Sequence, residues 1–204
     1  MTAKICPVIH VETAPQLEHN MNIAVEAGID GVFLINHSID PASLAVLFRN
    51  FRPSYPNLWI GLNYLGLPPH LAAKMSTGAD GLWMDGVPTQ LLGLNIPVFG
   101  GVGFKYQHTG LTLEEEVARA ILHVDVIVTS GVATGQPASP QKVRDLKALI
   151  GGVPLGLASG LTPENVQSYL PWVDWLLVAT GVSRDFTHLC PDKLRDFVAA
   201  VRTA

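Results

Sequence analysis

The chain of 204 residues can bury one sizeable core, whereas two independent domains would each be small, so we expect a single domain over residues 1–204. Hydrophobic residues make up 48% of it and charged residues 15%, which excludes a disordered chain and favours strands buried on both faces. The net charge of −4 provides no broad basic field, which argues against nucleic acid or an anionic membrane as the main partner.

The two cysteines, Cys6 and Cys190, are too few for a disulfide framework, and this predicts a reducing compartment. The first residues show no charged leader followed by a long apolar segment, and no apolar stretch reaches the roughly 20 residues that a membrane span needs. We therefore expect a cytoplasmic protein without membrane segments.

Short apolar runs alternate with segments of helical periodicity along the whole chain. Strands are expected over 5–11, 31–35, 58–62, 81–84, 97–104, 124–128, 153–157 and 172–178. Helices are expected over 15–27, 41–50, 113–122, 140–150, 163–170 and 191–201, with at most a short helix at 88–95. Several helices begin with a capping side chain followed by proline, as in Asp40-Pro41 and Ser139-Pro140.

Eight such units predict an α/β fold, a single compact (β/α)8 or TIM barrel. The alternative is an open doubly wound sheet, but Glu12-Thr13-Ala14-Pro15 stands where that fold carries a glycine-rich turn. Roughly 25 residues per unit leave little room for lids, because the complete fold averages about 250 residues. A bare mouth of this kind favours cover by a neighbouring subunit, that is, a homo-oligomer.

The strands end on polar residues, and the carboxyl ends of the strands form the functional mouth of a barrel. We predict catalytic roles for His10, Asn63, Asp85 and Lys105. Lys105 shares a strand face with Gly103, where an ammonium group can meet an anion, form a Schiff base or shuttle a proton. A lysine that only reaches the rim, and turn-forming roles for Asn63 and Asp85, are the simpler alternatives.

Two further strand-end residues, Glu12 and Asn36, are accessory candidates. Glu12 shares a face with His10 and could orient the imidazole, although it could equally be a surface residue that begins the first helix. The His, Asp and Glu residues lack metal-ligand spacing such as His-x-His, so we predict no metal and no other cofactor. The glycines at 100, 101 and 103 indicate either packing against bulky neighbours or close approach of a ligand.

Each of the last three strands ends in small residues that include a hydroxyl group and a glycine. Such ends leave backbone N–H groups without a hydrogen-bond partner, so that they can bind an anion. Barrels frequently bind phosphate between the loops after strands seven and eight. Ordinary turn chemistry is the alternative. The predicted phosphate-binding residues are Thr129, Gly131, Ser159, Gly160, Thr180, Gly181 and Ser183.

The segments 125–135, 158–165 and 178–183 resemble the BtpA/SgcQ-like TIM-barrel family, with weaker similarity at 7–10, 61–63 and 102–105. The resemblance implies a barrel that acts on phosphorylated or nucleotide-like molecules. Family members commonly carry acidic residues where this chain has Ile35 and Gly101, and a histidine where it has Tyr106.

Two functions follow as alternatives. The first is an enzyme, a transferase, lyase or isomerase, that acts on a phosphoribosyl compound, a sugar phosphate or another phosphorylated small molecule. The second is a non-catalytic assembly or regulatory factor that retains the barrel and its pocket, which the replaced carboxylates at Ile35 and Gly101 favour.

Overall fold

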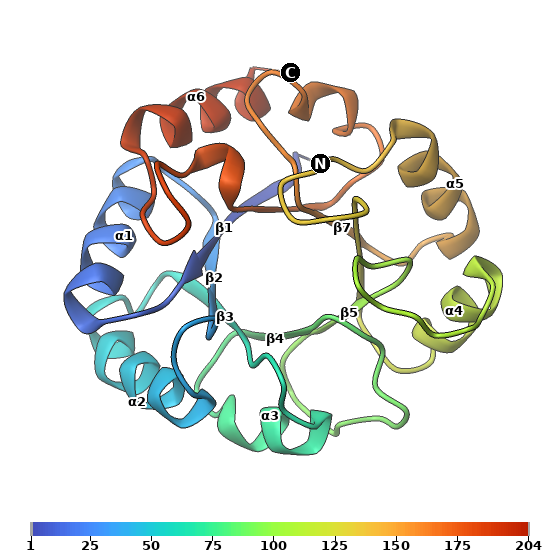
Figure 1. The fold of residues 1–204 in the computed structure, drawn as a ribbon, viewed down its shortest axis with the longest axis horizontal. Coiled ribbons are helices and arrows are strands. Elements are labelled where there is room, and N and C mark those ends of the chain that lie inside the picture. Colours follow the sequence, from blue (N-terminus) through green and yellow to red (C-terminus); the bar gives the residue numbers. More distant parts are fainter. Residues whose placement is uncertain (1, 204) are drawn as a thin grey trace.

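The computed structural model describes residues 2–203, which form a closed barrel of eight parallel strands in chain order (Figure 1). The strands are β1 (Lys4–His10), β2 (Gly31–Ile35), β3 (Trp59–Asn63), β4 (Gly81–Met84), β5 (Val98–Gly101), β6 (Val126–Ser130), β7 (Leu155–Ala158) and β8 (Trp175–Val178). Each strand pairs with the next, and β1 closes the ring by pairing with β8, Cys6 opposite Leu177. The predicted (β/α)8 fold class is confirmed.

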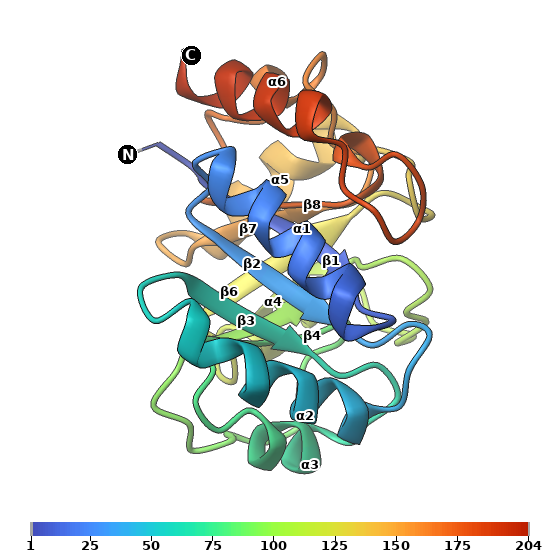
Figure 2. The same ribbon diagram turned by 90° about the vertical axis from the view of Figure 1, so that its left-hand side faces the viewer.

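Within residues 2–203, six α-helices surround the barrel, and α1 and α2 lie against its outer face in the side view of Figure 2. They are α1 (Ala14–Glu26), α2 (Pro41–Phe51), α3 (Pro69–Met75), α4 (Leu113–Ala120), α5 (Pro140–Ile150) and α6 (Pro191–Arg202). Asp40 and Ser139 cap α2 and α5 as predicted, each accepting hydrogen bonds from backbone N–H groups of the first turn. No helix within the described residues is long and apolar enough to cross a bilayer.

Several expected elements differ from the structure, and α3 was not expected. The fifth strand ends at Gly101 rather than 104, because Gly103 takes a positive φ of 52° and begins a turn. The expected helix at 163–170 is reduced to one 3₁₀ turn, η2 (Val166–Ser168), and no helix forms at 88–95. In the segment 88–95, Gly93 takes a positive φ of 63°, which an α-helix does not allow.

Aromatic rings fill the half of the barrel interior that lies near the amino ends of the strands. We call this cluster the aromatic plug; its members are Phe33, Trp59, Phe99 and Trp175. Ring centroids of neighbouring members lie 4.9–5.9 Å apart in mostly edge-to-face contacts. Glycines on the interior face of neighbouring strands leave room for the plug. A Cβ atom on Gly81 would lie 2.6 Å from the Trp59 ring, and one on Gly61 would overlap Phe33.

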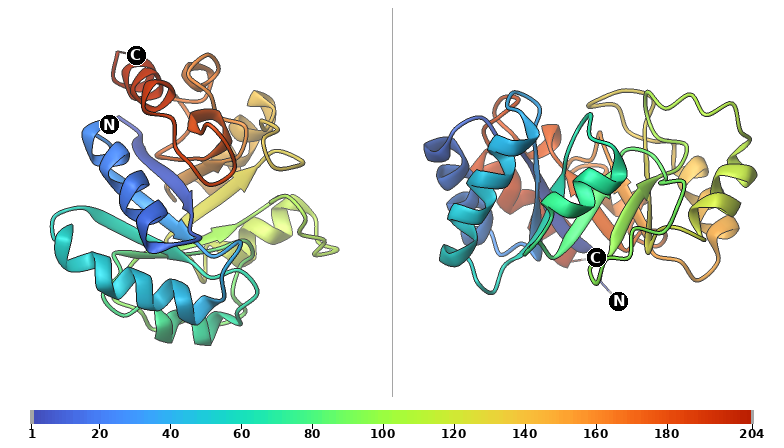
Figure 3. Two further views of the ribbon diagram at one scale, coloured as in Figure 1. Left: turned by 60° about the vertical axis from the view of Figure 1, so that its left-hand side comes forward. Right: turned by 90° about the horizontal axis from the view of Figure 1, so that it is seen from below.

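One carboxylate before each even-numbered strand ties that strand to the preceding one. Asp30, Asp80, Asp125 and Asp174 each accept a hydrogen bond, at 2.7–2.8 Å, from the backbone N–H of Ile5, Ile60, Val98 and Leu155 respectively. These bonds lie where the strands begin. Residues at this end of a barrel contribute to the stability of the fold rather than to catalysis. The opposite end is therefore left for loops, and the loops after β5 and β6 rise above the strands in Figure 3 (right).

Candidate active site at the barrel mouth

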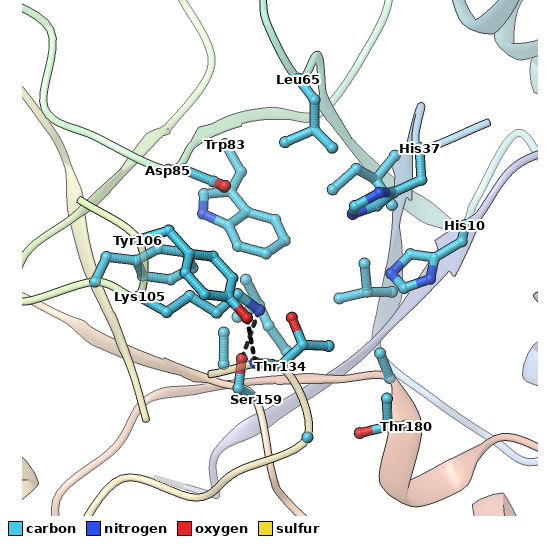
Figure 4. A pocket seen from close by; sticks show the side chains of 17 residues that line it. His10, His37, Leu65, Trp83, Asp85, Lys105, Tyr106, Thr134, Ser159 and Thr180 are labelled. Atoms are coloured by element: carbon cyan, nitrogen blue, oxygen red, sulfur yellow. Dashed lines mark hydrogen bonds between the residues drawn. The ribbon is translucent and has the colours of Figure 1, made fainter. Parts of the chain in front are cut away.

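A cavity of about 120 Å³ opens at the carboxyl ends of the strands, above the aromatic plug (Figure 4). Every strand or the loop after it contributes to the walls. The lining residues are Val8, His10, Ile35, His37, Leu65, Trp83, Asp85, Phe104, Lys105, Tyr106, Thr134, Gly135, Ala158, Ser159, Leu177, Ala179 and Thr180. Most of the wall is apolar, and the ionisable groups that face it are one lysine, one aspartate, two histidines and one tyrosine.

Lys105 reaches the cavity from the turn after β5. Its backbone N–H donates to Ser130 Oγ at 2.8 Å, and its Nζ donates to Ser159 Oγ at 2.7 Å. Burial lowers the pKa of the Lys105 ammonium, and attraction to Asp85 opposes that shift. The expected fifth strand would place Lys105 on the strand face of Gly103, which is wrong because β5 ends four residues earlier, at Gly101. The turn that follows nevertheless brings Lys105 to the mouth.

The Lys105 turn is anchored from two helices. The Gly103 N–H donates to Glu116 Oε2 of α4 at 2.6 Å, and Lys142 Nζ of α5 donates to the carbonyl oxygens of Gly103 and Ser130 at 2.5 and 2.6 Å. A charged donor and a charged acceptor on one glycine fix the path of the backbone. The side chain two residues later is therefore held over the mouth.

Asp85 follows β4 and accepts a hydrogen bond from Asn63 Nδ2 at 3.1 Å. Burial raises the pKa of the Asp85 carboxyl, while the Asn63 bond and the charge of Lys105 lower it. Asn63 does not line the cavity itself but stands behind Asp85. The two residues form a unit in which an amide orients a half-buried acid.

His10 and His37 form one wall, with ring centroids 5.0 Å apart. His10 Nδ1 lies 2.9 Å from the Phe186 carbonyl oxygen; a carbonyl only accepts, so Nδ1 carries the hydrogen and Nε2 is an acceptor. Burial, followed by repulsion from His37, lowers the pKa of His10 to about 4. Burial also lowers the pKa of His37, against the attraction of Asp85. Both imidazoles are therefore neutral at pH 7.

Trp83 lies between Asp85 and the histidines and is only 4% exposed (Figure 4). Its indole Nε1 has no hydrogen-bond partner within residues 2–203. A buried N–H donor without an acceptor costs free energy unless something accepts its hydrogen bond. Trp83 lines the cavity, although its Nε1 atom is itself buried.

The predicted phosphate-binding residues divide into two groups. Ser159 and Thr180 line the cavity. The glycines instead allow loops to touch: a Cβ atom on Gly131 or Gly160 would overlap the backbone of residues 136–137, and one on Gly181 would overlap Leu161. Within residues 2–203, the backbone N–H groups of Ser159, Gly160, Thr180 and Gly181 donate to no protein acceptor.

Two of the predicted phosphate-binding hydroxyls lie away from the cavity. Thr129 is fully buried and alternates with Val128, which faces the barrel interior, so Thr129 faces the helices. Its Oγ1 has no hydrogen-bond partner in the described chain. Ser183 Oγ donates to the Ala179 carbonyl oxygen and closes the turn after β8.

The two accessory candidates also lie apart from the cavity lining. Glu12 is exposed between α1 and α2, and its N–H donates to Gln16, so the structure does not bring its carboxylate to His10. Asn36 is buried and joins two loops, because its Oδ1 accepts from the Leu65 N–H at 2.8 Å. Across residues 2–203, no three His, Cys, Asp or Glu side chains gather as a metal-binding group.

The sequence argument did not select Trp83, Tyr106, Thr134 or Phe186. Tyr106 adopts a left-handed φ of 62°, and its hydroxyl oxygen accepts from the Thr134 N–H at 3.2 Å, so it joins the loops after β5 and β6. The period-two pattern could have found Trp83, because it shares a strand face with Asp85. Phe186 could not be found in this way, since it meets His10 across 176 residues of sequence.

Neither a family model nor a curated protein matches the chain. Solved structures share its fold. Phosphoribosyl anthranilate isomerase from Thermus thermophilus superposes with a TM-score of 0.70 at 15% identity, covering 98% of each chain. A 4-hydroxy-2-oxoglutarate/2-dehydro-3-deoxyphosphogluconate aldolase superposes with a TM-score of 0.71 at 15% identity, and the match covers 99% of this chain and 94% of the aldolase chain. Thiamine phosphate pyrophosphorylase from Pyrococcus furiosus superposes with a TM-score of 0.66 at 14% identity, and the match covers 98% of this chain and 96% of the pyrophosphorylase chain.

These similarities define the class: the chain is a TIM barrel, the fold shared by an isomerase, an aldolase and a pyrophosphorylase. At 14–15% identity the similarity extends to the fold alone, and function must be argued from the mouth of this barrel.

Proposed function

We propose that the protein is an enzyme that acts on a small phosphorylated compound, with the phosphate held by the loops after β7 and β8. The observation that carries the proposal is the contact of Lys105 Nζ with Ser159 Oγ, 2.7 Å long, at the edge of the β7 loop. It puts a half-buried amine beside the bare N–H groups of Ser159 and Gly160. The reacting group and the anion site then lie side by side.

Several features support an anion at this edge. Backbone N–H groups in a turn with left-handed residues form a concave donor set, and Ser159 and Gly160 have φ values of 70° and 66°. Thr180 adds a hydroxyl, and a 3₁₀ turn, η3 (Thr180–Val182), begins there. The three similar structures are named for a phosphoribosyl compound, a phosphogluconate and a thiamine phosphate, so a phosphate group is common to the compounds in their names.

The other side of the mouth supplies the proposed chemistry. Lys105 would carry charge or a proton, and the neutral His10 would accept a proton at Nε2. Asp85, oriented by Asn63, would face the reacting end of the substrate. These roles suit proton transfer next to a carbonyl or at a leaving group, as in an isomerase, lyase or transferase.

Three finer expectations belong to the same proposal. They are membership of the BtpA/SgcQ-like family, assembly into a homo-oligomer and a cytoplasmic location. The substrate class is a phosphoribosyl compound, a sugar phosphate or a nucleotide-like molecule.

Thermal unfolding with a panel of sugar phosphates, phosphoribosyl compounds and nucleotides tests the proposal, with the matched unphosphorylated sugars as controls. A ligand at 100 times its Kd should stabilise the fold by about 2.7 kcal/mol and raise Tm by roughly 5–10 °C. The Lys105→Ala variant should keep this rise and lose turnover. A panel that produces neither stabilisation nor turnover contradicts the proposal.

A second candidate is a non-catalytic assembly or regulatory factor. It is favoured by Ile35, which presents an aliphatic side chain to the cavity at a position where the resemblance to the BtpA/SgcQ-like family implies an acidic residue. A stoichiometric protein partner that binds wild type and Lys105→Ala equally, together with no turnover of any panel member, would support this candidate.

A further inference from the structure

We propose that the amine of Lys105 condenses with the carbonyl group of a small aldehyde or ketone in the cavity and forms an imine. This inference rests on the proposed function, because it names the class of compound that the same site takes: one that carries a carbonyl group beside its phosphate.

The surroundings of Lys105 Nζ suit a nucleophilic amine. Lys105 forms no ion pair within the described chain, and its one side-chain hydrogen bond goes to a neutral hydroxyl, Ser159 Oγ. The Nζ reaches a cavity whose wall is mostly apolar, and desolvation there outweighs the attraction of Asp85 for the ammonium. Such an environment favours the uncharged amine, the form that attacks carbonyl carbon.

Lys142 shows what distinguishes Lys105. It is also half-buried with a lowered pKa, for the same reason of desolvation. Its Nζ, however, donates to two carbonyl oxygens, of Gly103 and Ser130, and does not line the cavity. Lys105 alone of the two combines desolvation with access to a ligand.

Imine formation uses only the Lys105 amine, the carbonyl compound and groups that line the cavity. The Lys105 nitrogen lone pair attacks the carbonyl carbon, and the carbonyl oxygen takes up a proton to give a carbinolamine. The carbon–oxygen bond then breaks, and the oxygen leaves as water with the two hydrogens that the amine has lost, producing a carbon–nitrogen double bond. Asp85 lines the same cavity, and burial raises its pKa, so it can hold the proton that the departing oxygen takes.

Trp83 is an independent observation that points to an oxygen-bearing ligand. Its Nε1 is a buried donor with no acceptor within residues 2–203, in the wall that also holds Lys105 and Asp85. An oxygen on the ligand, at or next to the reacting carbon, would accept this hydrogen bond. Trp83 is therefore proposed as a positioning residue for the imine.

The experiment is reductive trapping. The protein is incubated at pH 7 with dihydroxyacetone phosphate, pyruvate or glycolaldehyde, each with sodium cyanoborohydride, and the adducts are mapped by peptide mass spectrometry. We expect a single adduct on the Lys105 peptide with at least one probe, formed roughly ten-fold or more faster than on exposed Lys74, since lower basicity leaves more free amine. The Lys105→Met variant should lose this adduct and Lys74→Met should keep it.

Two further readouts separate chemistry from folding. Circular dichroism and Tm should show that Lys105→Met remains folded, because Nζ makes only one side-chain hydrogen bond. Trp83→Phe, which keeps an aromatic but smaller side chain and removes the N–H, should slow trapping by roughly ten-fold, the effect of one lost hydrogen bond of about 1.4 kcal/mol.

The inference is overturned if no probe labels Lys105, or if labelling is spread evenly over Lys74, Lys142 and Lys105. Its failure is distinguishable from that of the proposed function. Phosphate esters that raise Tm and are turned over with dependence on Lys105, but without trapping, would leave Lys105 as a proton carrier. Trapping on Lys105 without any stabilisation by phosphate esters would keep the imine and reject the phosphate site.

Discussion

The backbone of Gly101 lies so close to the carbonyl oxygen of Asp85 that a Cβ atom at position 101 would overlap it. An acidic side chain therefore cannot stand at Gly101 in this barrel. The carboxylate on this side of the mouth comes instead from Asp85, which follows the neighbouring strand, β4. Glycine at position 101 thus allows the backbones of Gly101 and Asp85 to approach each other closely.

Substituting Gly101→Ala should destabilise the fold by about 1–3 kcal/mol, because the β4 and β5 backbones must separate. Urea unfolding measures the loss. Gly152→Ala is the matched control, since a Cβ atom there meets nothing within 4 Å. An equal effect of the two substitutions would show that the Gly101 contact is not tight in solution.

The depressed pKa of His10 should make the fold less stable in acid. The pKa is 6.5 for a free histidine and about 4 in the folded protein, so protonation favours the unfolded chain. Stability contributed by neutral His10 is complete above pH 6.5 and is lost as the pH falls towards 4, by roughly 3 kcal/mol in total.

Proton NMR of the imidazole signals measures the His10 pKa directly, and urea unfolding between pH 7 and 4 measures the loss. The His10→Gln variant should lose less stability over this range than wild type. His70→Gln, at an exposed position, is the control and should follow wild type. A His10 signal that titrates near 6.5 would contradict the prediction.

Ser159 has a left-handed φ of 70°, which costs a residue with a Cβ atom about 1–2 kcal/mol. Ser159→Gly relieves that strain and Ser159→Ala keeps it, while both remove the hydroxyl that Lys105 contacts. We expect Ser159→Gly to be more stable than Ser159→Ala by about 1 kcal/mol, and both to reduce turnover. Equal unfolding free energies would argue against the left-handed conformation.

Thr129 and Thr180 separate structural from ligand-binding hydroxyls. Thr129→Val should raise the free energy of unfolding by about 1 kcal/mol, since it removes a buried hydroxyl without a partner, and leave ligand affinity unchanged. Thr180→Val should weaken binding of inorganic phosphate by roughly ten-fold, measured by calorimetry. A Thr129→Val variant that binds phosphate more weakly would show that this hydroxyl does face the ligand.

Local patterns were enough to predict the barrel. The strands at 31–35 and 81–84 and the helix at 140–150 have the expected bounds, because glycine or a capped proline marks their ends. The strand expected at 97–104 was too long, since apolar content continues past Gly101 while the backbone does not. Periodicity cannot locate a change in φ inside an apolar run.

The candidate site depended on contacts that a linear pattern does not contain. The strand-end rule placed His10, Asp85 and Lys105, and the structure brings these three together in one cavity. It could not show that the Phe186 carbonyl holds His10, or that Gln136 and Pro137 fill the space beside Gly160. Both facts arise where distant loops pack, which the alternation of strands and helices leaves undetermined.

The aromatic plug has a kinetic consequence. Phe33, Trp59, Phe99 and Trp175 close the barrel below the cavity, so molecules can enter and leave only through the mouth. In the enzyme proposed above, a product still in the cavity would block the next substrate molecule. Product inhibition that is competitive with substrate is therefore expected for a cavity with a single entrance.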